Sequence, residues 1–554
     1  MNRRLLGAVL AVLLVFLLPS RASAQGGMIR GVASDSSGAP LSGIEVILMG
    51  TTRRMVTRGD GRFEFRGVSA GSHRIQVRGI GFLEGASQFQ LAPGDAVDLT
   101  VMLARVPVEV ASLTVIGSRA RHTAAEELAV PVDVFTSEDI KSQGSSETAT
   151  ILQALAPSVN FPRQTVTDAN DIVRPFTLRG LSPDQSLVLL NGWRRHQTAL
   201  VNNFAYGMPA GSSGVDMNAI PSGAIERIEV LRDGASAEYG SDAIAGVVNV
   251  VTRDGVFSPF LTADAGRYIT GKFPDDGTTV DVNGGWGLRL GRGSLALFGE
   301  FRDRQPTNRA WADPFETGTN GLADSINSDG QVVVKRNAVP QPNHHWGDGL
   351  EKDVMTLANF RLPLNSTGSE LYAFGDYSFR RGTGNGYRRY AADSTRNWSD
   401  IYPLGYLPEF HPDVTDYSAT GGWRSAANGW ALDFGGTYGH NDFVYNLRNT
   451  MNVSLGPCLD VACNPGPDSI PSTGDEIPNQ TSFDAGTVSR NELILAGNAS
   501  REMHLGLPAP VHVAFGLAWR REGYQIQAGE LASWVDGRDT TMGGGIAPAG
   551  SQVF

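Results

Sequence analysis

Four neighbouring side chains combine an indole ring with three groups able to carry positive charge: Trp193, Arg194, Arg195 and His196. They follow a Leu-Asn-Gly turn, and such a cluster is suited to binding an anionic or polyhydroxylated ligand. The alternative is that its cationic members pair with carboxylates elsewhere in the protein, because a buried charge needs a partner. We favour the pairing and keep ligand binding as the second hypothesis.

Sequence patterns for catalysis are missing from the chain. It has no Walker-type phosphate loop, no Gly-x-Gly-x-x-Gly opening a helix, no His-Glu-x-x-His pair and no Gly-x-Ser-x-Gly motif. His344 and His345 are adjacent, a spacing that does not form a defined metal site. The sequence therefore predicts neither an enzyme nor a bound metal or cofactor.

Composition excludes further classes of protein. The 554 residues are 41% hydrophobic, which is enough to bury a core and argues against disorder. A formal charge of −11 argues against nucleic-acid binding, which requires a basic surface. The N-terminus has the pattern of a secretory signal peptide: Arg3 and Arg4, an apolar run from Leu5 to Leu18, and a cleavage site ending at Ala24. A membrane anchor is the alternative, but the run is shorter than the ~20 residues that span a bilayer.

Export bears on the only two cysteines, Cys458 and Cys463. Turn-forming Gly and Pro residues flank them, and only four residues separate them. In an oxidising compartment the expected state of such a pair is a disulfide. Two thiolates without nearby histidines do not complete a tetrahedral zinc site, so a metal is the less favoured alternative.

The elements that hold these residues are predicted to be mainly β. Residues 25–104 contain six short runs separated by turns: 29–33, 44–49, 53–58, 62–66, 71–77 and 97–103. This pattern predicts a β-sandwich. It resembles the carboxypeptidase regulatory-like domain, also called a carbohydrate-binding-like fold. The residues that carry the resemblance are Gly31, Pro40, Gly43, Val46, Asp60, Gly61, Phe63, Gly71 and Gly79. We favour a spacer role over sugar binding.

Residues 120–255 predict a compact α+β unit. Helices are expected from Ser137 and over 147–156, with strands at 176–179, 187–190, 225–231 and 246–252. Several long motifs occur here in order, and their amino-acid sequence resembles the plug domain of TonB-dependent outer-membrane receptors. The motif residues are Arg179, Gly180, Asn191, Gly192, Glu226, Arg227, Glu229, Arg232, Asp233, Gly234, Tyr239, Gly240, Asp242, Gly246 and Asn249.

Charges alternate along part of this unit, at Glu226, Arg227, Glu229, Arg232, Asp233 and Glu238. The resemblance implies that they lie inside a barrel. Two interpretations stay open: a latch that is unlocked for transport, and ordinary pairing within the plug.

Residues 256–554 predict about ten antiparallel strands beginning near Ser258. Apolar and small or polar residues alternate, as in 511–520, 430–440 and 294–301, which fits a transmembrane β-barrel strand and also a soluble antiparallel sheet. Connection lengths favour the barrel. Hairpins at 278–304, 351–380, 414–440 and 489–522 have short turns, whereas 305–350, 381–413 and 441–488 are long. Family barrels have about twice as many strands, so we expect that the C-terminal part of the barrel is missing.

The segment 105–119 links the sandwich and the plug and resembles a TonB box, centred on Leu113, Thr114, Val115, Ile116 and Gly117. A run of this kind can be added as a strand to a partner's sheet; the alternative is a structural strand of the linker. The resemblance implies an outer-membrane receptor that takes up a siderophore, cobalamin, oligosaccharide or peptide with energy from TonB. Its expected partners are TonB, the extracellular ligand and outer-membrane lipid. The alternative is a carbohydrate-binding surface or adhesion protein without energised transport.

Overall fold

The structure is a computed structural model. It describes residues 26–35, 38–78, 85–103, 132–167, 169–203, 208–365, 368–461, 477–506, 511–537 and 550. The predicted signal peptide 1–24 and the segment 113–117 therefore lie outside the described residues. The chain divides into two compact units, Met1–Leu113 and Thr114–Phe554, and each is described by itself.

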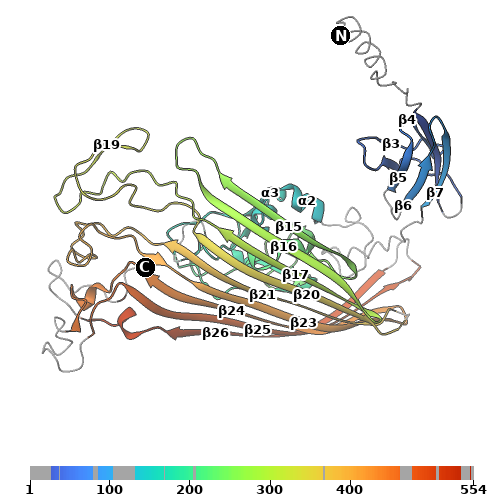
Figure 1. Cartoon of the computed structure of the whole chain (residues 1–554). Helices are drawn as coiled ribbons and strands as arrows, with labels where there is room; N and C mark the ends of the chain where they lie inside the picture. The colour runs from blue at the N-terminus through green and yellow to red at the C-terminus, as the bar shows by residue number, and fades with distance from the viewer. Residues whose placement is uncertain are drawn as a thin grey trace, which may run out of the picture. The chain divides into compact units, whose positions relative to one another are not determined.

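The described part of the first unit is a β-sandwich, as predicted (Figure 1, blue). One sheet has the order β4-β1-β7, formed by Arg62–Val68, Gly27–Asp35 and Ala96–Leu103. The other has the order β3-β2-β5-β6, formed by Arg54–Val56, Glu45–Leu48, Gly71–Arg78 and Gly85–Leu91. Ile29, Val46, Ile75 and Val77 are fully buried between the sheets. Strand β6 was not predicted, because Gly85 and Ser87 on its more buried side are not apolar.

The plug forms the first part of the second unit and is an α+β layer. Its sheet has the order β12-β11-β14-β13-β8, formed by Trp193–Arg194, Ser186–Leu190, Gly246–Thr252, Ile225–Leu231 and Val132–Thr136. The helices are α2 (Ser137–Ser142), α3 (Thr148–Leu155) and α4 (Ser236–Tyr239), and β9 (Val159–Asn160) pairs with β10 (Thr177–Leu178). Short 3-10 turns η2 (Pro183–Gln185), η3 (Met217–Ala219) and η4 (Ser222–Ala224) connect them.

The N-cap of the first plug helix lies one residue before Ser137, the residue predicted as the cap and helix start. Thr136 is the N-cap, and it forms a capping box with Asp139, whose carboxylate accepts the Thr136 backbone N–H at 2.9 Å. A capping box satisfies backbone N–H groups that the first turn leaves unpaired. Hydrogen bonding to Thr136 lowers the pKa of Asp139.

In the described residues after the plug, ten strands form one large antiparallel sheet (Figure 1). Its strands are β15 (Phe257–Tyr268), β16 (Asp276–Leu290), β17 (Gly293–Arg304), β20 (Leu350–Pro363), β21 (Glu370–Asn385), β22 (Glu409–Phe410), β23 (Asp413–Ala427), β24 (Trp430–Arg448), β25 (Ser482–Met503) and β26 (Val511–Ala528). Among the described residues, β15 and β26 each pair on one side only. A mainly β architecture is thus confirmed.

Short and long connections alternate along this sheet, as predicted. The turns at 291–292 and 428–429 each have two residues, whereas 305–349, 386–412 and 449–481 are long. Strands β21, β24 and β25 run further than expected, so two of the long loops are shorter than predicted. The first long loop is also not structureless, since β18 (Ser325–Ile326) pairs with β19 (Val332–Val334) inside it.

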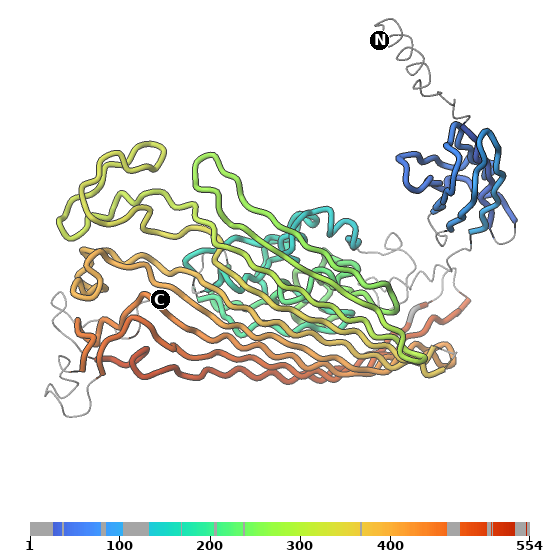
Figure 2. The backbone as a smooth tube through the Cα atoms, viewed as in Figure 1, coloured from blue at the N-terminus to red at the C-terminus, as the bar shows by residue number. Residues whose placement is uncertain are grey.

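The two faces of the sheet differ in chemistry. Large apolar side chains are exposed on one face, including Leu297, Phe301, Phe434, Leu495, Phe515, Leu517 and Trp519. Alternate positions on the other face are buried and carry charged or polar groups, including Asp281, Glu300, Arg302, Glu351, Asp353, Asp376, Arg380, Asp416 and Glu492. The plug, cyan to green in Figure 2, lies against this second face. Among the described residues, no helix combines the length and apolarity needed to cross a membrane.

Candidate functional site

The plug–sheet interface, where plug side chains meet the polar face of the sheet, holds the strongest arrangement of charges. Arg195 follows β12 and is almost completely buried. Its guanidinium donates to Asp376 on β21 at 2.6 Å and to Ser418 on β23 at 2.7 Å, and also pairs with Asp416 on β23. Burial lowers the pKa of Arg195, but the two carboxylates outweigh burial and hold the pKa above its usual value.

His196 joins the same cluster. Its Nε2 lies 2.9 Å from Asp416, whose other contacts include a hydrogen bond from Asn441 at 2.9 Å. The ring lies flush against Gly439 on β24, where a Cβ would meet the ring Nδ1 at 2.2 Å. For Arg195 and His196 the structure therefore shows pairing with carboxylates of the sheet, the interpretation that the sequence favoured.

Trp193 and Arg194 point to different partners. The Trp193 indole N–H donates to the Tyr372 hydroxyl at 2.9 Å, and that hydroxyl donates to Asp433 at 2.7 Å. Arg194 instead pairs with Asp242 inside the plug. Trp193, Arg195 and His196 thus attach one hairpin of the plug to β21, β23 and β24, whereas Arg194 pairs within the plug; ligand binding by these four residues stays a prediction.

A second group of ion pairs crosses the interface at the other plug elements. Arg174 binds Glu147 at 2.9 Å and Asp348 at 3.1 Å, and Arg304 on β17 pairs with Glu147 and with Glu351 on β20 at 2.6 Å. Burial raises the pKa of Glu147, but the two arginines outweigh it, so the pKa lies well below its usual range. None of these residues was singled out from the sequence.

A third group joins the plug to the centre of the sheet. Arg380 on β21 binds Asp216 of the plug at 2.7 Å, and Arg302 on β17 donates to the plug carbonyl of Ser146 at 3.0 Å. Both arginines also hold Asp353 on β20. Nearby, Glu300 accepts the backbone N–H of Ser222 at 2.6 Å. Removing one partner of a buried pair is strongly destabilising, so these contacts hold the plug in place.

The charges predicted as a possible latch pair inside the plug. Arg227 binds Glu229 at 2.8 Å and Arg232 binds Asp133 at 2.7 Å. Arg179 and Asp233 are 3.9 Å apart and both about half exposed. Glu226 is exposed, and the Glu238 side chain lies outside the described residues. These described pairs therefore fit the interpretation of ordinary pairing within the plug.

The other motif residues form turns and internal hydrogen bonds. Positive φ angles occur at Arg179, Gly180, Asn191, Gly192, Gly240 and Gly246. A Cβ at Gly246 would meet the Leu231 carbonyl oxygen at 2.2 Å, so the close approach of β14 to β13 requires glycine. Asn249 donates to Glu229 at 3.0 Å and accepts the Gly192 N–H. The Tyr239 carbonyl accepts from Arg194, and Gly234 follows β13 at the surface.

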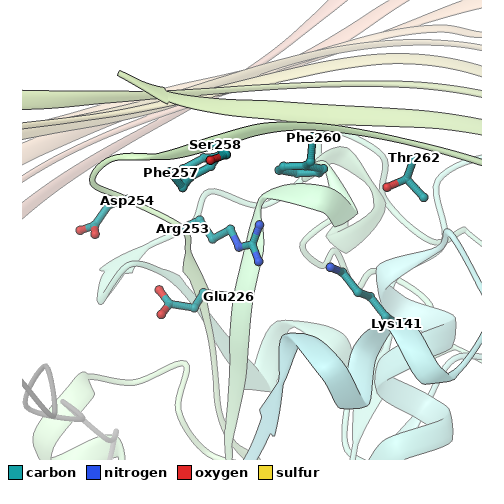
Figure 3. Close-up of a pocket in the computed structure, with 8 residues that line it drawn as sticks. All are labelled: Lys141, Glu226, Arg253, Asp254, Phe257, Ser258, Phe260 and Thr262. Carbon is teal, nitrogen blue, oxygen red and sulfur yellow. The ribbon is translucent and has the colours of Figure 1, made fainter. Parts of the chain in front are cut away.

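A pocket of about 520 Å³ lies between the plug and β15 (Figure 3). Arg253 stands over the rings of Phe257 and Phe260 at 5.7 and 5.4 Å from their centroids. Lys141 and Glu226 approach from the plug side (Figure 3). Because β15 is an edge strand of the described sheet, this pocket is open.

The predicted cysteine and histidine positions lie in long loops. Cys458 has no free thiol, and Cys463 lies outside the described residues, so their pairing stays a prediction. His344 contacts Asp313 at 3.1 Å, and burial lowers the pKa of His345. Within the described ranges, no three His, Cys, Asp or Glu side chains are arranged to hold a metal.

Family models match two parts of the chain. Residues 124–247 match the TonB-dependent receptor plug domain, and residues 28–104 match the carboxypeptidase regulatory-like domain. A ferric enterobactin receptor of Pseudomonas aeruginosa is 30% identical over 147 residues, which are 26% of this chain and 19% of that protein. The vitamin B12 transporter BtuB of Photobacterium profundum is 30% identical over 218 residues, 39% of this chain and 30% of that protein. The alignments thus cover less than a third of these relatives.

Solved structures with a similar chain path include a mutant of the ferric enterobactin receptor PfeA from Pseudomonas aeruginosa. It is 17% identical with a TM-score of 0.46, and the match covers 76% of this chain and 53% of that one. The siderophore receptor PirA from Acinetobacter baumannii is 16% identical with a TM-score of 0.44, covering 74% and 50%. The domain matches confirm the resemblance found in the sequence: the chain carries a TonB-dependent receptor plug domain and a carboxypeptidase regulatory-like domain.

Proposed function

We propose that this protein is an outer-membrane receptor in which the plug gates energised uptake of a scarce or bulky ligand. The observation that carries the proposal is the buried plug–sheet interface, in which Arg195 and Arg174 of the plug bind carboxylates of the sheet and its loops. A gate of this kind needs a plug that is well seated at rest and held by polar contacts that can be exchanged for water.

The exposed face of the sheet supports a location in lipid. Leu517 and Phe515 on β26 are 81% and 62% exposed, and Leu297 on β17 is 42% exposed. Scattered apolar residues are normal on soluble proteins, but a continuous apolar band that alternates with an inner polar face is typical of membrane barrels. Outer-membrane barrels have short periplasmic turns and long extracellular loops. Because short and long connections alternate along the large sheet, the long loops are proposed to face the cell exterior.

The proposed energising partner is TonB, and the proposed contact is the segment Leu113–Gly117. Its β-branched residues favour an extended strand that can pair with a partner's sheet edge. Deleting these five residues should abolish energised uptake and leave ligand binding largely intact, because the segment's proposed role is to transmit force and not to form the ligand pocket.

The ligand class is inferred from relatives, whose names include ferric enterobactin and vitamin B12. The experiment supplies radiolabelled ferric enterobactin and, separately, radiolabelled cobalamin to cells whose own receptors for these compounds are deleted. The protein is tested intact, with Leu113–Gly117 deleted, and in cells without TonB.

Uptake of either probe that requires both TonB and the segment would support the proposal. Binding at the cell surface that is equal in all three cases, without accumulation, would contradict it for these probes. If labelled oligosaccharides were then retained in the same TonB-independent way, the adhesion alternative would replace uptake.

A further inference from the structure

Asp171 is a buried carboxyl at the plug–sheet interface that the ion pairs described above do not include. It is 1% exposed, and neither of its oxygens has a hydrogen-bond partner in another residue of the described chain. Its carboxyl group lies against β21, where a Cβ at Gly384 would meet the two oxygens at 2.5 and 2.6 Å. Desolvating an ionised carboxylate without a partner is highly unfavourable, and such a group takes up a proton instead.

The neighbouring cations are already committed to other acids. Arg174 binds Glu147 and Asp348, while Arg304 binds Glu147 and Glu351. Two guanidinium groups therefore face three carboxylates before Asp171 is counted. A third cation, Arg163, reaches Asp348 at 2.7 Å but is half exposed.

The backbone next to this carboxyl is strained. Val166 has a φ of 59° and Ala169 a φ of 71°, a region that residues with a Cβ seldom adopt and that is least favourable for a β-branched side chain. The same segment is held down by Ile172, whose side chain contacts the position of a Cβ at Gly382 at 2.6 Å. Strain and an unpaired acid thus occur together in one plug segment.

We propose that Asp171 is a proton-binding site of the seated plug, so that segment 169–174 docks with a neutral carboxyl and loosens when that proton dissociates. The inference concerns this chain's own interface and does not depend on the proposed uptake. The group donating or accepting the proton is bulk water, and no other co-reactant is needed.

The electrostatic surroundings agree with this assignment. Burial raises the pKa of Asp171 to about 7, and Glu351 raises it too, whereas its own backbone N–H, Arg174 and Arg304 act in the opposite direction. Because the folded pKa lies above the usual value of 3.8 for an aspartate, docking takes up a proton, and stability falls as pH rises between these two values. Compared with a side chain that stays neutral at every pH, the equilibrium constant for opening of the plug segment is about 17-fold larger at pH 5 and about 1,400-fold larger at pH 8.

Infrared spectroscopy of the purified full chain tests the assignment directly. The carbonyl stretch of a protonated carboxylic acid is recorded from about pH 5 to about pH 9 for the wild type, Asp171→Asn and Asp171→Ala. Asp184→Asn, a change at an exposed carboxyl of the same plug, is the control. We expect one component of this band to be present in the wild type and the control and missing from both Asp171 variants, and half of that component to be lost near pH 7.

Hydrogen exchange of segment 169–174 gives a second readout. The opening equilibrium constant is obtained from the exchange rate after correction for intrinsic exchange. In the wild type this constant should increase about 90-fold from pH 5 to pH 8, whereas in Asp171→Asn it should stay nearly constant. A wild-type spectrum without the band, as an ionised carboxyl with a bound cation would give, would overturn the proposal. An equal pH dependence of exchange in the wild type and Asp171→Asn would overturn it as well.

Discussion

Replacing Arg195 by methionine should unseat the plug. The guanidinium is the group that joins Asp376 on β21 to Asp416 on β23, and all three side chains are at most 5% exposed. Arg195→Met keeps much of the apolar stem and removes the charge. Two carboxylates are then left buried on the sheet without the guanidinium, and Asp416 keeps His196 and Asn441 as partners.

The expected effect follows from the burial of this pair. Breaking a buried ion pair from one side destabilises by about 3–5 kcal/mol, because the remaining charge is desolvated without compensation. At 1.36 kcal/mol for each factor of ten, the population of unseated plug rises about 150- to 5,000-fold. The matched control is Arg179→Met, since Arg179 and Asp233 are exposed and 3.9 Å apart. A surface pair of this kind contributes about 0–1 kcal/mol, or at most about a fivefold change.

Labelling of a buried cysteine measures the unseated population. Ala199→Cys places a thiol at a fully buried plug position, whose backbone N–H donates to Asn441 on β24 at 2.7 Å. Maleimide reacts with it only when the plug leaves the sheet, so the rate follows the open population when opening is fast. The reasoning is refuted if Arg195→Met and Arg179→Met change the rate by the same small factor. Recovery of slow labelling when Asp376→Asn and Asp416→Asn are added would show that stranded charge is the cause.

Two further predictions concern single positions. Labelling of the denatured protein, purified without reductant, should find no free thiol at Cys458 and Cys463, and two reactive thiols would show that the predicted disulfide is absent. Gly439→Ala should weaken seating by about 1–3 kcal/mol, because the added methyl collides with the His196 ring. Gly299→Ala, whose Cβ would meet nothing closer than 4.0 Å, is its control, and equal cysteine labelling in the two variants would count against the collision.

Strand positions in this protein were predictable because they depend on local periodicity. Strand β13 was predicted over the residues that the structure gives, and the hairpins of the large sheet were found within a few residues. Strands β21, β24 and β25 ran further than expected, and in β21 the buried positions Gly382 and Gly384 interrupt the apolar alternation near the loop. The capping residue was shifted by one position, because Thr136 and Ser137 are both suitable caps.

The partners in the interface were not predictable from sequence. Arg195 meets Asp376 from 181 positions away, and Arg174 meets Asp348 from 174 positions away. Nothing local distinguishes these carboxylates among the 57 acidic residues of the chain. One signal was present. Arg302 and Asp353 are charged residues on strands whose alternate positions carry apolar side chains, which places the charges on the face opposite the apolar one.

In the proposed uptake the plug must move against the sheet, and a reversible covalent lock between the two would prevent that movement. An ideal Cβ at Gly223 on η4 lies 3.4 Å from the Asn283 Cβ on β16, close to the separation of about 3.5–4.5 Å in disulfides. The double variant Gly223→Cys with Asn283→Cys should therefore form a bond between plug and sheet.

We expect the oxidised double variant to bind the transported probe without accumulating it, and reductant to restore accumulation. The single variant Gly223→Cys, treated in the same way, should accumulate the probe with and without reductant. Equal accumulation by the oxidised and reduced forms of the double variant, with the bond verified by its mobility on a gel, would contradict the account.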